Sequence, residues 1–269
     1  MIAQTFNPSR TLLLFRKYAF EHARIYLMLY LAIAAFLILW LGVYLNFTNP
    51  KLFSERGQVA YYFITLFLTG CLSSGMLFSE LGSKPGAIHY LLLPASTLEK
   101  FITNLIFGVV LFFVMCSLIF TGVDFVAVTI ANYRYGTNWQ VINLLSLNQY
   151  QNPFFEGPVT DMFYFYFPAQ AVFLLCSVYF RKHGLFKAIV VMGLLWVLFI
   201  AIFILYQHAM PMGRFVGGIE LYEVLEPSGD NKLVSIPPFI FISALVFFKF
   251  LITPLLWASA YFRLKEKEL

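Results

Sequence analysis

Residues 27–45 read LMLYLAIAAFLILWLGVYL, an unbroken apolar run without a single charged side chain. As an α-helix with a rise of about 1.5 Å per residue, a run of this length crosses the roughly 30 Å hydrocarbon core of a bilayer. The whole chain agrees with this interpretation, since 61% of its residues are apolar, 12% are charged and its mean hydropathy is +0.79. Such a composition excludes an ordinary soluble domain. We therefore expect an integral membrane protein.

Further apolar runs predict an all-α integral membrane protein with six transmembrane helices in one domain, residues 1–269. The third span can extend to Ile130, because only Asp124 interrupts its apolar run. The first span lacks the small-residue exit of a secretory signal, so we expect it to be retained. The predicted spans are residues 25–45, 59–78, 101–123, 163–180, 188–206 and 238–262.

Lysine and arginine residues are distributed unequally between the two ends of these spans. Twelve of the eighteen flank the ends that include both termini, five flank the opposite ends, and Lys249 lies within the sixth span. Because basic residues concentrate on the inner side of a membrane, we expect both termini and segment 79–100 in the cytoplasm. Segments 124–162 and 207–237 are then external. The basic residues are scattered singly, so no nucleic-acid partner is expected.

The first 24 residues predict an arm that precedes the first span. Asn7 can cap a helix that begins at Pro8 and continues to Arg24. Its charged residues form one stripe and its apolar residues face away, which is typical of an amphipathic helix at the membrane interface. A simple basic anchor that orients the first span explains the same residues, and the sequence leaves both interpretations open.

Segment 79–100, SELGSKPGAIHYLLLPASTLEK, predicts a compact loop between the second and third spans. Pro85 and Gly86 begin it with turn chemistry, a short Leu-rich amphipathic helix follows, and Pro94 ends that helix. Ser96 can cap the next helix, with Glu99 three residues later as the reciprocal partner of a capping box. A pre-shaped loop of this kind is what a soluble partner needs in order to bind.

The sequence contains no pattern typical of a catalytic or metal site. It has no G-x-x-x-x-G-K-[ST] nucleotide-binding motif, no G-x-S-x-G nucleophile turn, and no metal-binding spacing among its four histidines. The three cysteines, Cys71, Cys116 and Cys176, lie inside apolar runs and are interpreted as packing residues. We therefore expect no catalytic residue, no metal ligand and no cofactor bound by this chain.

Two features within the spans point to contacts between helices. Lys249 lies in the sixth span, where a charge costs about 2.5–3.5 kcal/mol to insert, so it is a candidate for a polar contact in a translocation path. A lysine that extends to the membrane surface or pairs with a neighbouring helix is the alternative. In the second span, the small residues Gly70, Ser73, Ser74 and Gly75 predict a close packing seam.

The six spans, the internal termini, the basic arm, and the loop with Leu93-Pro94-Ala95-Ser96 and Glu99-Lys100 together resemble the permease subunit of a type-2 ATP-binding-cassette (ABC) exporter. The resemblance implies that segment 83–96 is a coupling helix that docks on a cytoplasmic ABC ATPase subunit, which binds the ATP and Mg²⁺. It implies that the arm approaches the same ATPase, and that short re-entrant helices occupy segment 207–237. It also implies a second permease copy, in a homodimer or heterodimer embedded in the lipid of a bacterial cytoplasmic membrane.

The resemblance assigns ATPase coupling to a set of residues in this loop. We expect the apolar face of the coupling helix, formed by Ile88, Tyr90, Leu91 and Leu92, to fill a groove on the ATPase. A membrane scaffold or sensor that does not transport is the main alternative, and an integral membrane enzyme is disfavoured by the missing catalytic pattern. The candidate coupling residues are Lys84, Pro85, Ile88, His89, Tyr90, Leu91, Leu92, Pro94, Ser96 and Glu99.

Overall fold

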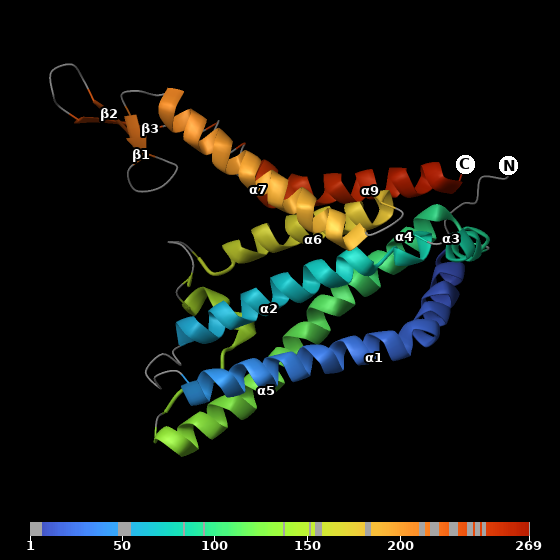
Figure 1. Cartoon of the computed structure of the whole chain (residues 1–269), viewed down its shortest axis with the longest axis horizontal. Helices are drawn as coiled ribbons and strands as arrows, with labels where there is room; N and C mark the ends of the chain where they lie inside the picture. Colours follow the sequence, from blue (N-terminus) through green and yellow to red (C-terminus); the bar gives the residue numbers. More distant parts are fainter. Residues whose placement is uncertain are drawn as a thin grey trace.

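The protein is built mainly of long helices that lie side by side (Figure 1). The structure, a computed structural model, describes residues 7–47, 55–82, 84–93, 95–136, 138–150, 152–153, 158–180, 184–209, 213–215, 221–225, 231–235, 239, 243 and 246–268.

Five helices in the described part of the chain are long and apolar enough to cross a membrane. They are α1 (Pro8–Phe47), α2 (Glu55–Met76), the continuous helix Thr97–Tyr135, α6 (Asp161–Tyr179) and α7 (Gly184–Ala209). The protein is therefore a multi-pass integral membrane protein. The exposed faces agree with this class: on α7, Trp196 and Phe199 are each 67% exposed, as a lipid-facing helix requires.

The predicted sixth span is described only in part. The π-helical turn η5 (Phe247–Leu251) leads into α9 (Ile252–Glu268), which packs against α6. Residues 240–242 and 244–245 lie outside the described part of the chain, so a continuous span over 238–262 stays a prediction.

The arm and the first span form one helix, α1, with no break near Arg24. Its first part, drawn in the darkest blue, stands at a steep angle to the remainder (Figure 1). Asn7 caps this helix as predicted, since its Oδ1 accepts a hydrogen bond from Ser9 N at 3.0 Å. Whether the arm lies at a membrane interface stays a prediction.

The third span is longer than predicted. The helices α4 (Thr97–Leu105) and α5 (Phe112–Tyr135) are joined by the π-helical turn η3 (Ile106–Leu111), which gives one helix of 39 residues. Asp124 does not end it, because its side chain is buried and accepts a hydrogen bond from Ile142 N at 3.3 Å. The helix ends at Gly136, whose φ of 64° suits a residue without a side chain. Residues 124–135 of the predicted external segment therefore continue this helix, and the point at which it leaves the membrane stays a prediction.

Three short strands follow α7 in the described part of the chain, within a protein that is otherwise built of helices as predicted. They are β1 (Gly213–Phe215), β2 (Leu221–Leu225) and β3 (Asn231–Ser235), which form an antiparallel sheet in the order β1-β2-β3. The described residues of 207–237 beyond α7 are thus strands, not the re-entrant helices that the family resemblance implied. Aromatic and β-branched residues favour strands, and Tyr222 and Val224 of β2 and Val234 of β3 are of these types.

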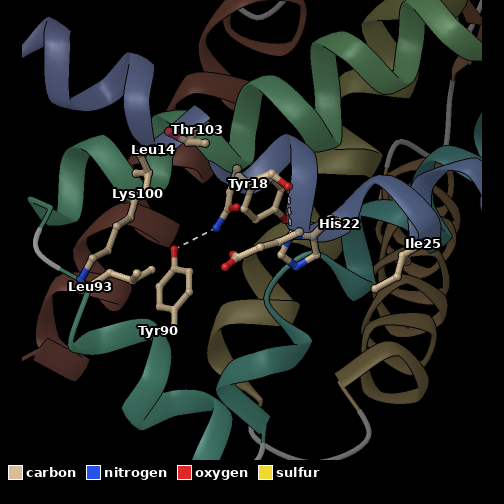
Figure 2. Close-up of a pocket in the computed structure, with 10 residues that line it drawn as sticks. Leu14, Tyr18, His22, Ile25, Tyr90, Leu93, Lys100 and Thr103 are labelled. Carbon is tan, nitrogen blue, oxygen red and sulfur yellow. Dashed lines mark hydrogen bonds between the residues drawn. The ribbon is translucent and has the colours of Figure 1, made fainter. Parts of the chain in front are cut away.

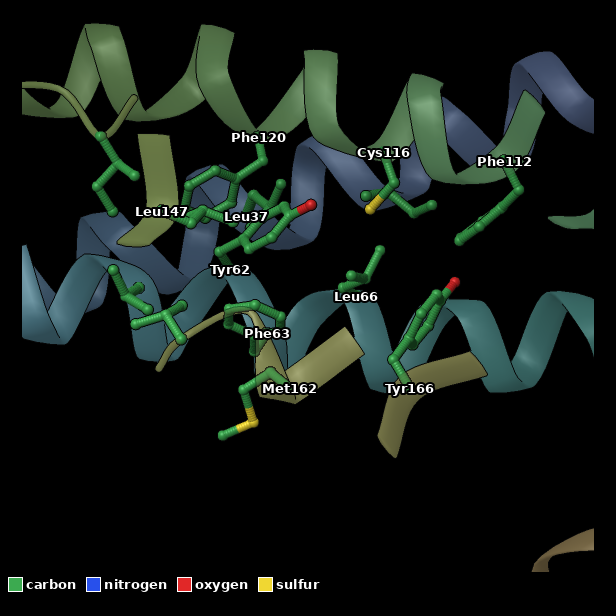
Figure 3. Packing of buried hydrophobic residues seen from close by; sticks show 14 residues of the cluster. Leu37, Tyr62, Phe63, Leu66, Phe112, Cys116, Phe120, Leu147, Met162 and Tyr166 are labelled. Carbon is green, nitrogen blue, oxygen red and sulfur yellow. The ribbon is translucent and has the colours of Figure 1, made fainter. Parts of the chain in front are cut away.

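The main core lies between α1, α2, α5 and the first turns of α6 (Figure 3). The rings of Tyr62 and Phe120 meet edge-on at a centroid distance of 5.1 Å, and Tyr62 Oη lies 2.9 Å from Ser117 Oγ. The small-residue seam is confirmed at two positions. A methyl group on Gly70 would lie 2.4 Å from Tyr166 Oη, and one on Gly75 would lie 3.3 Å from Phe173. The seam therefore brings α2 close against α6.

A second contact fixes α6 to the π-helical turn. Gln170 is buried and its Nε2 donates a hydrogen bond to the carbonyl oxygen of Gly108 at 3.1 Å. A π-helical turn breaks the regular pattern of backbone hydrogen bonds, which leaves a carbonyl available for a side chain. Gln170 thus ties the long helix to α6 at Gly108.

Candidate functional site

The loop between α2 and α4 contains the short helix that the sequence predicts. After the 3₁₀ turn η2 (Ser79–Gly82), α3 (Lys84–Leu91) forms one compact helix, with Pro85 in its first turn. Proline is tolerated there because the first backbone N–H groups of a helix have no intrahelical partner. The start of α1, α3, the start of α4 and the end of α9 lie at one end of the molecule (Figure 1).

The predicted capping box at the start of α4 is confirmed. Ser96 is extended, with φ −67° and ψ 153°, and its Oγ accepts a hydrogen bond from Glu99 N at 3.2 Å. In return, Glu99 Oε2 accepts from Ser96 N at 2.9 Å. Both residues are buried, so they shape the fold and do not present a surface to a partner.

Glu99 also holds the start of α1, which the sequence did not predict. Its second oxygen, Oε1, accepts a hydrogen bond from Asn7 N at 2.8 Å and lies 3.8 Å from the Arg10 guanidinium. The Glu99 side chain has no exposed surface. One carboxylate therefore joins the first turns of α1 and α4, which lie 92 residues apart in the sequence.

Tyr90 faces the protein interior, so its assignment to the ATPase-docking face was wrong. Its side chain is 6% exposed, its ring lies 6.3 Å from that of Phe78, and its hydroxyl oxygen accepts a hydrogen bond from Asn104 Nδ2 at 2.8 Å. Side chains two positions apart on a helix are rotated by about 200° around its axis, so Tyr90 points away from Ile88 and Leu92. Those two side chains are 60% and 76% exposed.

The candidate coupling residues thus divide into two groups. Pro85, Ile88 and Leu92 are exposed, whereas Tyr90, Ser96 and Glu99 are buried. Pro94 and the side chains of Lys84, His89 and Leu91 lie outside the described part of the protein. The backbone of Leu92 continues the helical pattern by donating to the Ile88 carbonyl at 3.0 Å, so Ile88 and Leu92 lie on one face, one turn apart.

A pocket of about 280 Å³ separates the first part of α1 from α3 and α4 (Figure 2), and we call it the arm pocket. Lys100, at its edge, is only 3% exposed, and its Nζ lies 5.7 Å from the centre of the Tyr90 ring. The pocket is lined by Leu14, Tyr18, Glu21, His22, Ile25, Tyr90, Leu93, Lys100, Thr103 and Asn104.

The α1 side of the arm pocket is a polar stripe. The rings of Tyr18 and His22 stack at 4.1 Å, and His22 Nδ1 lies 3.3 Å from the Tyr18 carbonyl oxygen. Glu21 pairs with Lys17 at 3.5 Å on the exposed surface. The residues that line the pocket are spread along the chain from residue 14 to residue 104, so no short sequence motif predicts it. The spacing of Tyr18, Glu21, His22 and Ile25 on one helix face was the only signal in the sequence.

Lys249 pairs with a neighbouring helix. Its Nζ lies 2.8 Å from Asp161 Oδ1 and 4.7 Å from the centre of the Tyr164 ring. At the other end of the same helix pair, Lys267 donates a hydrogen bond to the Val178 carbonyl oxygen. Lys249 therefore lies level with the first residue of α6 and not with its middle. The pairing interpretation is confirmed, and a role in a translocation path stays a prediction.

The pair predicts a measurable coupling between Lys249 and Asp161. Lys249→Met and Asp161→Asn are each expected to lower the free energy of unfolding in detergent. The double variant is expected to lose about 1 kcal/mol less than the two single losses added together. The value is small because both side chains keep about a quarter of their surface exposed, at 27% and 25%. Additive losses in a double-mutant cycle of thermal unfolding would contradict the pairing.

Comparisons of the chain with protein-family models, with curated proteins and with solved structures gave no match.

Proposed function

We propose that this chain is the transmembrane subunit of an ABC exporter. With a second permease copy it forms a translocation path and couples that path to ATP hydrolysis by separate cytoplasmic ATPase subunits, which bind ATP and Mg²⁺. The observation that carries the proposal is α3, a short helix that exposes Ile88 and Leu92 while its opposite side is fixed to α4 by the Tyr90–Asn104 hydrogen bond.

The contacts around α3 suit an element that transmits displacement. Tyr90 fixes α3 to α4, and Glu99 fixes the start of α4 to the start of α1. A partner that pulls on Ile88 and Leu92 therefore moves the first turns of two long helices together. Binding of nucleotide to the ATPase supplies such a pull, because it biases an assembly with two arrangements.

The proposed orientation places α3 in the cytoplasm of a bacterial cell, with both termini on the same side of its cytoplasmic membrane. Two observations support it. The start of α1, α3 and the end of α9 lie at one end of the molecule (Figure 1). The same end carries the excess of lysine and arginine residues.

Charged substitutions on the exposed face of α3 test this function. Ile88→Asp and Leu92→Asp are each expected to weaken binding of the proposed ATPase subunit by about 30-fold, because each removes an interface contact worth about 2 kcal/mol. The measurement is sedimentation of that ATPase with inside-out vesicles, and right-side-out vesicles are expected to bind none. Leu145→Asp, at a position 98% exposed in the segment after α5, is the matched control and should bind normally. Wild-type binding by both α3 variants would overturn the proposal.

A further inference from the structure

The first part of α1 has one side packed on the protein and another side exposed. Phe15 and Tyr18 face inward, since their rings lie 4.5 Å and 4.9 Å from the ring of Phe107 on η3. On the side that faces away, Leu12 and Phe20 are 70% and 74% exposed. This part of α1 stands at a steep angle to the remainder, which is long and apolar enough to span a membrane (Figure 1). A helix with an exposed apolar side at such an angle to a span lies along the membrane surface.

Two arginines stand on the same exposed side. Arg16 and Arg24 are both exposed, and no acidic side chain in the described part of the chain lies within 4 Å of either guanidinium group. The Arg16 guanidinium lies 5.9 Å from the centre of the Phe20 ring, which is a contact that leaves its charge uncompensated.

The other basic residues of this part of α1 have acidic neighbours. Arg10 lies 3.8 Å from Glu99, and Lys17 lies 3.5 Å from Glu21. The positive charge that remains without a carboxylate is therefore that of the two exposed arginines.

Arg16 stands within the apolar side of the helix and not at its border. Leu12 and Phe20 are each four positions away, so an exposed apolar side chain lies one helical turn to each side of this guanidinium. Such an arrangement suits the level at which lipid phosphates meet acyl chains. Apolar side chains can enter the acyl region there, while the planar guanidinium donates two parallel hydrogen bonds to a phosphate. Arg24, two turns further along, can bind the phosphate of a second lipid.

We propose that the exposed side of α1 between Leu12 and Arg24 binds acidic phospholipids, with lipid phosphates at Arg16 and Arg24. The charge decides the class of lipid. A zwitterionic headgroup carries a cation that the two arginines repel, whereas an acidic phospholipid keeps a net negative charge. This inference does not rest on the proposed transport function, because binding requires only this chain and a membrane.

The test is lipid contact at this helix in the full-length protein, measured in bilayers of equal phosphatidylglycerol and phosphatidylcholine. Ala23, an exposed residue on the same side, is replaced by cysteine and labelled with a fluorophore. A nitroxide quencher is carried on the acyl chains of one lipid or of the other. The fluorescence is expected to be quenched at least two-fold more strongly when phosphatidylglycerol carries the nitroxide. Protein without the Ala23→Cys substitution measures the background from the three native cysteines.

Two variants assign this difference to the arginines. The double variant Arg16→Gln, Arg24→Gln is expected to be quenched equally by the two lipids, since both charges that face lipid are lost. Arg56→Gln removes an exposed arginine from the first turn of α2 and is the matched control, which should keep the full difference. Because Arg16 and Arg24 are exposed, the double variant is expected to unfold at the temperature of the unsubstituted protein.

Three outcomes would overturn the proposal. Equal quenching by the two lipids with both arginines present would show that the helix does not select acidic lipid. A folded double variant that keeps the difference would place the selection elsewhere in the protein. Quenching by neither lipid would place this side of α1 against water or a protein partner.

Discussion

Replacing Glu99 by alanine is expected to lower the free energy of unfolding by about 3–5 kcal/mol. The carboxylate is fully buried and accepts hydrogen bonds from the backbone N–H groups of Asn7 and Ser96. Its removal leaves both donors unpaired, at about 1–3 kcal/mol each, while the cap that Ser96 Oγ provides to the backbone N–H of residue 99 remains. The ion pair with Arg10 adds little, because Arg10 is 39% exposed and 3.8 Å away.

Thermal unfolding of the purified protein in detergent measures this loss, with Glu266→Ala as the matched control. Glu266 also pairs with an arginine, Arg263, but on the exposed surface of α9, so its replacement should cost less than about 1 kcal/mol. Equal losses for the two variants would mean that Glu99 acts only as an ordinary surface cap.

Replacing Gly70 by leucine is expected to cost about 3 kcal/mol or more, since it forces α2 away from α6. A first side-chain carbon at this position would lie 2.4 Å from Tyr166 Oη and 2.8 Å from Tyr166 Cε2. Tyr166 cannot move aside easily, because it is fully buried and its ring meets Phe67 edge-on at 5.5 Å. The expected result is a lower yield of folded protein and a lower unfolding temperature.

Gly122→Leu provides the control for this substitution. Gly122 also lies within a helix, but no atom comes within 4 Å of the carbon that a side chain would add. Leucine there should stabilise the protein by up to about 1 kcal/mol through its higher helix propensity. A Gly70→Leu variant as stable as Gly122→Leu would show that the α2–α6 seam is loosely packed in the membrane.

Local features of the sequence predicted the structure well. The helices follow from long apolar runs, and the capping box follows from Ser96 and Glu99 three residues apart, because both depend on neighbours in the chain. The sequence did not predict which face of α3 is buried and which is exposed. Its composition is apolar on both sides, and only the fold of α3 back onto α4 decides that Tyr90 is buried while Ile88 is exposed.

Contacts between segments that lie far apart in the chain could not be predicted from the sequence. From the sequence, Glu99 is interpreted as a helix cap that stabilises the protein by about 1 kcal/mol. Nothing in the sequence indicates that the backbone N–H of Asn7 donates to its second oxygen. The sequence predicts that Lys249 lies deep in a span, because apolar residues stand on both sides of it. Its pairing with Asp161 at the first residue of α6 depends on how the two helices are aligned, which the sequence of either helix alone does not specify.

The helix from Thr97 to Tyr135 has 39 residues, or about 58 Å at 1.5 Å per residue, and Gln170 holds it at Gly108. If it turns as a rigid rod about this contact, its arms are about 16 Å to Thr97 and about 40 Å to Tyr135. A sideways shift of about 1 Å at Thr97 becomes about 2.5 Å in the opposite direction at Tyr135. The segment that Asn132 attaches to this end, through its hydrogen bonds with Trp139, travels with it. In such a rigid turn, a small displacement at the capping box produces a larger one at the far side of the protein.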